Sequence, residues 1–239
     1  MFPRPSFFGN AKLNFAENLL FPSSNPDEDS YAVIEANEEG RNYVTWKELR
    51  ERVRQCTVAM RKLGVKQGDR VAGYVANHCN ALVAMLASTA IGALWTAISP
   101  DTGAHAVLDR VKQIEPVVLF SDNAVAYNGK VHEVQGKLRD ITRELPQLKV
   151  CVVFETIASH DIDLGQIPVA NGTACSHSSF VQSVTDEERL DFVQLPSDHP
   201  VYILYSSGTT GKPKCIVHGS IGTLIRKLYF LLVCFLISV

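Results

Sequence analysis

The stretch DRVAGYVANHCNALVAMLASTAIGALWTAI, residues 69–98, presents the order of elements that decides the fold. Residues 69–75 have the length and apolar content of a short strand. Residues 81–93 are apolar on every side, which is typical of a buried helix, and residues 94–98 form a second strand that a Ser-Pro pair ends. A strand, a helix and another strand in this order predict a parallel α/β arrangement.

The same alternation continues toward the C-terminus. A helix is predicted over residues 103–114, and an amphipathic helix over residues 132–145. The runs at 117–120 and 150–154 are continuously apolar, which is typical of strands that are covered on both faces. The sequence therefore predicts an α/β fold with a largely parallel sheet and flanking helices.

The N-terminal part carries a hairpin and a clearly marked helix. Two short β-type runs, residues 31–36 and 43–44, enclose a polar turn and predict the hairpin. A helix is predicted over residues 45–63, because Thr45 and Glu48 form a T-x-x-E capping box and apolar residues then repeat at helical spacing. A glycine directly after this helix is the expected end signal.

The composition is that of an ordinary soluble globular protein. Of the 239 residues, 46% are hydrophobic and 20% are charged, which excludes a disordered tail or a fibrous repeat. The formal net charge is −2, so the overall charge of the chain does not attract it to nucleic acid or to an anionic membrane. We therefore expect no nucleic-acid partner. The six cysteines have neither metal-site nor C-x-x-C spacing, and the N-terminus lacks the apolar core of a signal peptide. Both features favour reduced thiols and a cytoplasmic protein.

The C-terminal segment, residues 228–239, reads LYFLLVCFLISV and is almost wholly apolar. As a helix it would be about 18 Å long, which is short of the roughly 30 Å hydrocarbon core of a bilayer. A tail anchor is therefore the weaker alternative, and we expect no specific membrane span. The favoured interpretation is a core element cut off by premature chain termination.

A polar region and then a glycine-rich loop precede this segment. Residues 156–197 have weak periodicity, and we expect a long connection that holds one helix near 176–184. Residues 201–205 then form a strand that runs straight into residues 206–214, SSGTTGKPK.

This loop has the composition of a phosphate-binding segment. It holds two glycines, four hydroxyl side chains and two lysines. Glycines allow the backbone to approach anionic oxygens closely, and hydroxyls, backbone N–H groups and lysines then supply donors. It is not a Walker A loop, which requires G-x-x-x-x-G-K-[ST]. On composition alone, a solvated turn after a strand is an equal alternative.

Longer matches decide between these alternatives. Residues 205–218, YSSGTTGKPKCIVH, resemble the core signature of the adenylate-forming acyl-CoA synthetases. Residues 8–20 are similar to the entry block of the short-chain acid branch of that superfamily, and residues 43–49 resemble its next block. Residues 99–116 resemble the acetoacetyl-CoA synthetases more closely than the acetyl-CoA synthetases. The resemblance covers roughly residues 7–225.

The resemblance implies an ATP-dependent acid–thiol ligase. Acetoacetate would attack the α-phosphate of ATP to form an acyl-adenylate, and coenzyme A would then displace AMP. ATP, Mg²⁺ and CoA are the implied cofactors and co-substrates. No catalytic and no metal-binding residue is carried over to this chain. The residues implied to grip the β- and γ-phosphates of ATP are Ser206, Ser207, Gly208, Thr209, Thr210, Gly211 and Lys214.

The resemblance also implies that this chain is an N-terminal fragment. The family places its adenine-, acyl-, ribose- and magnesium-binding motifs, and a catalytic lysine, further along the chain. We therefore predict a partial AMP-binding domain over residues 1–225, followed by a divergent apolar tail over residues 226–239. The chain alone is expected to be inactive. The alternative is a non-catalytic product that binds nucleotide weakly or associates with partner proteins.

Two other constellations receive less weight. His218 could serve either serine of the loop in a hydrolase, but no G-x-S-x-G elbow surrounds them. His160, Asp161 and Asp163 could hold a metal ion, but in a polar loop a solvated cluster is the favoured interpretation.

Overall fold

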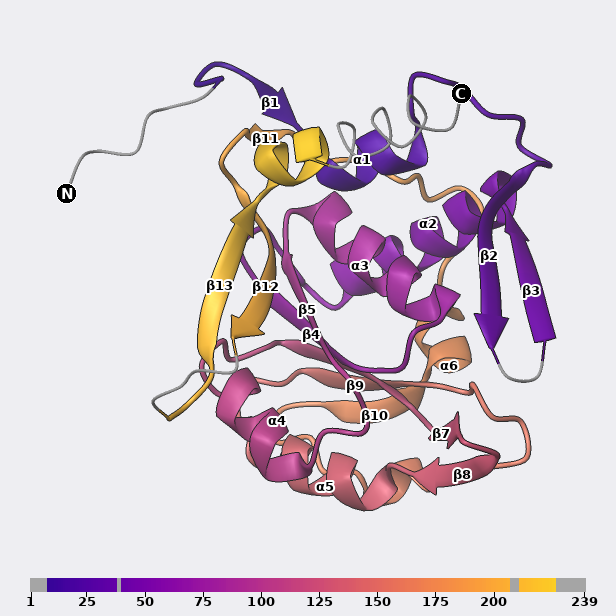
Figure 1. The fold of residues 1–239 in the computed structure, drawn as a ribbon, viewed down its shortest axis with the longest axis vertical. Coiled ribbons are helices and arrows are strands. Elements are labelled where there is room, and N and C mark those ends of the chain that lie inside the picture. Colours follow the sequence, from indigo (N-terminus) through magenta and orange to yellow (C-terminus); the bar gives the residue numbers. More distant parts are fainter. Residues whose placement is uncertain (1–7, 38–39, 207–210, 227–239) are drawn as a thin grey trace.

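The computed structural model of the chain describes residues 8–37, 40–206 and 211–226 (Figure 1). Its centre is a seven-stranded sheet with the strand order β10-β9-β6-β4-β5-β12-β13. Neighbouring strands run parallel, except for the antiparallel pair of β12 and β13. The predicted α/β fold with a largely parallel sheet is therefore confirmed. In sheet order, the strands are Thr173–Ser176, Val150–Phe154, Val118–Asp122, Arg70–Tyr74, Leu94–Ile98, Pro200–Ser206 and Lys214–Gly219.

Helices cover both faces of this sheet (Figure 1). Helices α2 and α3 lie on one face, and α4 and α5 lie on the other. Successive side chains of a strand point to opposite faces, so Val71 of β4 enters the core under α2 and α3, while Ala72 enters the core under α4 and α5. Burial on both faces explains why the central strands are continuously apolar. The helices are α2 (Trp46–Lys62), α3 (Cys79–Ile91), α4 (Ala104–Val111) and α5 (Gln135–Arg143).

Helix α2 begins and ends where the sequence predicts. The Thr45 side chain accepts a hydrogen bond from the Glu48 N–H at 3.2 Å, and the Glu48 carboxylate accepts one from the Thr45 N–H at 2.8 Å. Both halves of the predicted capping box are therefore present. At the other end, Gly64 has a φ of 80°, and the Val65 N–H donates to the Met60 carbonyl at 3.0 Å. This left-handed glycine closes the helix.

One predicted helix begins later than expected. Helix α5 starts at Gln135 instead of residue 132, because the preceding residues form a hairpin of β7 (Ala124–Tyr127) and β8 (Lys130–Glu133). The turn consists of Asn128 and Gly129, with φ values of 51° and 68°. An Asn-Gly pair is a strong hairpin signal, and it overrides the helical pattern of the residues that follow.

The predicted long connection over residues 156–197 holds more structure than expected. It contains β10, which adds to the sheet beside β9, and a helix α6 (His177–Val181) that is shorter than the predicted one. Near its end, β11 (Leu195–Pro196) pairs with β1 (Lys12–Leu13). Strands this short show no periodicity in sequence, so only their partners reveal them. The chain also contains α1 (Phe15–Leu20), η1 (Leu164–Gln166) and the predicted hairpin, confirmed as β2 (Tyr31–Asn37) and β3 (Gly40–Thr45), and residues 220–226 are helical.

In the described part of the chain, no helix has both the length and the apolar character to cross a membrane. The apolar segment at 228–239, for which the sequence raised a tail anchor as an alternative, lies outside the described residues. The interpretations offered for that segment stay predictions.

Candidate functional site

The predicted phosphate loop begins at the end of strand β12. This strand ends at Ser206 and β13 begins at Lys214, and the two residues face each other as the last pair of the ladder. Gly211 has a φ of 128°, a conformation that residues with a side chain rarely adopt. The structure thus describes three of the predicted site residues. The other four lie outside the described residues, namely Ser207, Gly208, Thr209 and Thr210.

This loop stands at the carboxyl edge of the sheet. Strand β12 runs parallel to β5, where Tyr202 pairs with Trp95, so the carboxyl ends of β12, β5, β4, β6 and β9 share one edge. The Thr96 hydroxyl adds a link between the two strands, since it donates to the Ile203 carbonyl at 2.8 Å. Ligands of open α/β sheets bind at this edge, outside the carboxyl ends of the strands.

Helix α4 and the turn after it pack against the start of the loop. The Arg110 guanidinium lies 5.8 Å from the centre of the Tyr205 ring. Ile114 and Ile203 are buried in one cluster, and Tyr205 and Cys215 pack against it. Burial raises the pKa of Tyr205 to about 12, so the phenol stays neutral at physiological pH. The strand end before the loop is therefore held by packing on its α4 side.

The geometry does not pair Ser206 with His218. His218 lies on β13 opposite Tyr202, and their rings stack with centres 4.9 Å apart. Ser206 lies opposite Lys214, four residues earlier on β13, so about 13 Å of strand separates the two positions. The hydrolase alternative through Ser206 is therefore wrong.

The polar cluster at residues 160–163 forms a local turn. The Asp163 carboxylate accepts from the Gly165 N–H at 3.0 Å and from the Gln166 side-chain amide at 2.8 Å. His160 uses its backbone carbonyl to accept from Asn123 at 2.7 Å. Within the described ranges, no three His, Cys, Asp or Glu side chains converge on a metal site.

A second polar region lies at the same edge of the sheet, at the carboxyl ends of β4, β6 and β9. It is a groove of about 700 Å³. The β2–β3 hairpin, the β7–β8 hairpin and the N-terminus of α3 all contribute to its walls, with Glu35, Asn80 and Lys130 among the lining residues. No motif in the sequence predicts this region. The signal that could have revealed it is the Asp122-Asn123 pair, two polar residues close after a buried apolar run.

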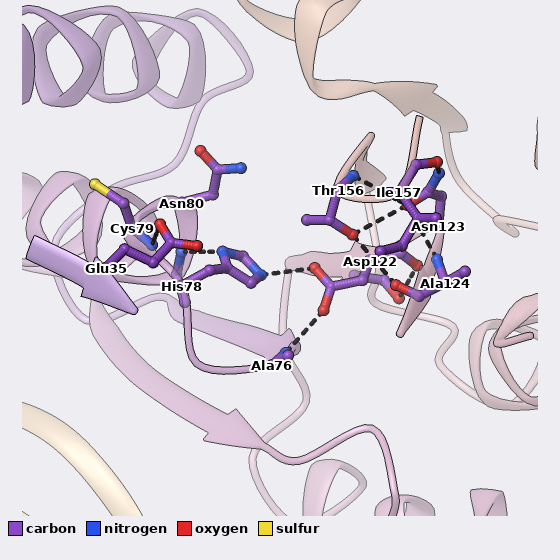
Figure 2. Close-up of polar contacts among 12 residues, drawn as sticks. Glu35, Ala76, His78, Cys79, Asn80, Asp122, Asn123, Ala124, Thr156 and Ile157 are labelled. Atoms are coloured by element: carbon purple, nitrogen blue, oxygen red, sulfur yellow. Dashed lines mark hydrogen bonds and ion pairs between the residues drawn. The ribbon is translucent and has the colours of Figure 1, made fainter. Parts of the chain in front are cut away.

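Asp122 lines this groove and joins the end of β6 to the loop between β4 and α3 (Figure 2). One carboxylate oxygen pairs with Nε2 of His78 at 2.8 Å, and the other accepts from the Ala76 N–H at 2.8 Å. Nδ1 of His78 accepts from the Ala81 N–H at the start of α3, so Nε2 carries the proton that is donated to Asp122. The pair therefore ties the end of β6 to the loop that enters α3.

The next residue, Asn123, ties the same strand end to the loop after β9 (Figure 2). Its side-chain oxygen accepts from the N–H groups of Ala124, Thr156 and Ile157 and from the Thr156 hydroxyl, at 3.0 to 3.1 Å. Its side-chain nitrogen donates to the carbonyls of Ile157 and His160 at 2.9 and 2.7 Å. The polar groups of Asp122 and Asn123 are thus partnered by the protein itself, and they form a rigid frame.

Comparison with known proteins reveals clear relatives. Residues 22–234 match the protein family described as AMP-binding enzyme. The malonamoyl-CoA synthetase of Penicillium aethiopicum is 52% identical over 229 residues, which cover 95% of this chain and 32% of that protein. The acetoacetyl-CoA synthetase of Macaca fascicularis is 46% identical over 227 residues, which cover 94% of this chain and 33% of that protein. These matches confirm the resemblance that the sequence predicts.

A solved structure agrees with the sequence matches. The acetoacetyl-CoA synthetase from Streptomyces lividans superimposes with a TM-score of 0.78 at 37% identity, over 90% of this chain and 31% of that protein. The chain thus spans about a third of the length of the relatives it matches. The family match runs to residue 234, past residue 225, and the predicted domain boundary there stays a prediction.

Proposed function

The chain belongs to the AMP-binding enzyme family, and on this basis we propose that it forms the ATP-polyphosphate-binding part of an acetoacetate–CoA ligase. The proposed reaction joins acetoacetate to AMP with release of pyrophosphate, and then transfers the acyl group to the thiol of CoA. The relatives named above act, by their names, on acetoacetyl and malonamoyl groups. Both acyl groups carry a second carbonyl at the β-carbon, so a short β-carbonyl acid is the proposed substrate class.

One observation carries this proposal: a strand parallel to its neighbour ends at Ser206, and Lys214 begins the next strand opposite it, three residues after the left-handed Gly211. We assign the phosphate grip to the seven predicted residues of this segment. A hydroxyl and an ammonium at the two ends of the segment would stabilise the negative charge that builds on the phosphoryl oxygens. These residues are Ser206, Ser207, Gly208, Thr209, Thr210, Gly211 and Lys214.

Mg²⁺ would accompany ATP and neutralise part of its charge. The described residues include no cluster of three possible metal ligands, so we assign no ligand of the ion to them. CoA is proposed as the acyl acceptor, without a contact assigned to it here. The five described cysteines are all free, which supports the proposed cytoplasmic location.

The loop assignment predicts the effect of removing two hydroxyls. The double substitution Thr209→Val with Thr210→Val is expected to weaken ATP binding by about tenfold to a hundredfold, because hydrogen bonds to charged oxygens are lost while side-chain shape is kept. Titration calorimetry with ATP, inorganic tripolyphosphate and AMP measures this effect. Tripolyphosphate should compete with ATP, and AMP should bind much more weakly than either.

The matched control is Thr173→Val, which removes a hydroxyl from the exposed edge strand β10. This variant should bind ATP as the unchanged chain does. Equal ATP affinity of the double variant and the unchanged chain would contradict the proposed phosphate grip.

A second prediction concerns catalysis. A polypeptide of these 239 residues is expected to release no pyrophosphate in the presence of acetoacetate, ATP and Mg²⁺. The family resemblance implies that the groups which position adenine and acid lie outside this stretch, and positioning supplies about 7–11 kcal/mol of such barriers. A coupled pyrophosphate assay tests this. Acetoacetate-dependent release above that of the Thr209→Val, Thr210→Val variant would contradict it, whereas ATP binding without release fits both the ligase assignment and the alternative of a non-catalytic nucleotide binder.

A further inference from the structure

The side chain of Gln113 contacts the residues on both sides of Lys214, although Gln113 itself lies outside the loop. Gln113 lies in the turn after α4, a hundred residues before Pro213. Its Nε2 donates to the Pro213 carbonyl at 2.9 Å, and its Oε1 accepts from the Cys215 thiol at 3.5 Å. These two partners are the residues on either side of Lys214. A single amide group thus holds the backbone before Lys214 and the side chain after it.

The Gln113 amide is itself held in place. Its Nε2 also donates to the Asp109 carbonyl, one turn back on α4, at 2.6 Å. Gln113 is exposed, and in this orientation both N–H groups and the oxygen of its amide have protein partners. Helix α4 in turn is anchored by Val107 and Val111, which are fully buried in the core under this helix. The Gln113 amide thus links helix α4 to the backbone at Pro213.

This contact has a direct geometric consequence for Lys214. The Pro213 carbonyl belongs to the same planar peptide unit as the Lys214 N–H, so fixing that oxygen fixes the plane on the N-terminal side of Lys214. The strand ladder alone constrains this point weakly, because Lys214 and Ser206 form the last pair of the ladder, and terminal pairs open most easily. Lys214 itself is exposed, and the peptide that Gln113 holds is the one from which its side chain departs.

We propose that Gln113 is a positioning residue for the phosphate grip: it holds the peptide before Lys214 so that the Lys214 ammonium points toward the polyphosphate of ATP. This inference rests on the proposed function and extends it to a residue outside the loop. It assigns no contact between Gln113 and the nucleotide.

A double-mutant cycle on the full 239-residue chain tests the inference, with inorganic tripolyphosphate as the probe. Lys214→Ala is expected to weaken binding about tenfold, and Gln113→Ala about three- to fivefold. The double variant should bind no more weakly than Lys214→Ala alone, because Gln113 acts through that lysine. Gln113→Glu keeps the shape and the acceptor but cannot donate and adds a negative charge, so it should bind tripolyphosphate no more tightly than Gln113→Ala. Lys112→Ala, which breaks an exposed ion pair with Glu144, is the control and should bind normally.

Hydrogen exchange adds a readout that involves no phosphate. Amides of residues 214–216 are expected to exchange about tenfold faster in Gln113→Ala and Gln113→Glu than in the unchanged chain or in Lys112→Ala. Unchanged exchange, or unchanged tripolyphosphate affinity in Gln113→Ala while Lys214→Ala binds weakly, would overturn the inference and leave the proposed function standing. Equal binding by Lys214→Ala and the unchanged chain would instead overturn the role of Lys214 in the proposed function, and the role of Gln113 with it.

Discussion

Replacement of Asn123 by alanine is expected to lower the free energy of unfolding by about 3–4 kcal/mol. The buried Asn123 amide donates to Ile157 and His160 and accepts from Ala124, Ile157 and Thr156. Alanine removes the partner of all these groups at once, and each polar group that is left without a partner in a part-buried position is destabilising. Urea unfolding followed by circular dichroism measures the loss.

Two further variants sharpen this test. Asn123→Asp keeps the acceptor but places a carboxylate oxygen next to the carbonyl oxygens of Ile157 and His160, which repel it. We therefore expect the free energy of unfolding to fall nearly as much as for alanine. Asn171→Ala is the control, since its exposed amide donates to the Pro146 carbonyl at the surface, and its effect should stay within about 1 kcal/mol. A loss below about 1 kcal/mol for Asn123→Ala would refute the assigned role of this amide.

Acidification is expected to destabilise the chain through His177. The ring lies at the start of α6 with its centre 5.0 Å from that of Phe154, and its buried Nε2 has no hydrogen-bond partner in the described part of the chain. Burial, and then the positive charge of Arg52, lower the pKa of His177 from 6.5 to about 4. Between these two values the unfolded chain binds a proton that the folded chain does not bind. The free energy of unfolding therefore falls as the pH drops from about 6.5 to about 4.

The size of this effect is on the order of 2–3 kcal/mol, since each pKa unit corresponds to about 1.4 kcal/mol. Other groups also titrate in this range, so the measurement compares the unchanged chain with His177→Phe in urea unfolding at several pH values. The variant should lose less stability on acidification by about that amount. His105→Phe, at a side chain that is 95% exposed, is the control. Parallel pH profiles for His177→Phe and the unchanged chain would count against a buried neutral imidazole.

The sequence by itself determined the elements whose signals are local. Helix α2 is marked by hydrogen bonds between Thr45 and Glu48, which are three residues apart, and by the glycine that follows. The central strands are marked by unbroken apolar runs, since both of their faces are buried. The sequence also contained the phosphate-loop signature, because such a loop is a continuous segment after a strand.

Only the tertiary structure decided the features that depend on partners far along the chain. Strand β10 has four residues and becomes a strand because β9 lies beside it. Asn123 and Gln113 look like ordinary polar residues in sequence, yet their amides hold segments that begin 33 and 100 residues later. A hydrogen bond across such a distance leaves no periodic or compositional trace, because folding alone brings the donor and the acceptor together. The sequence therefore revealed the loop, and the fold revealed what holds its end in place.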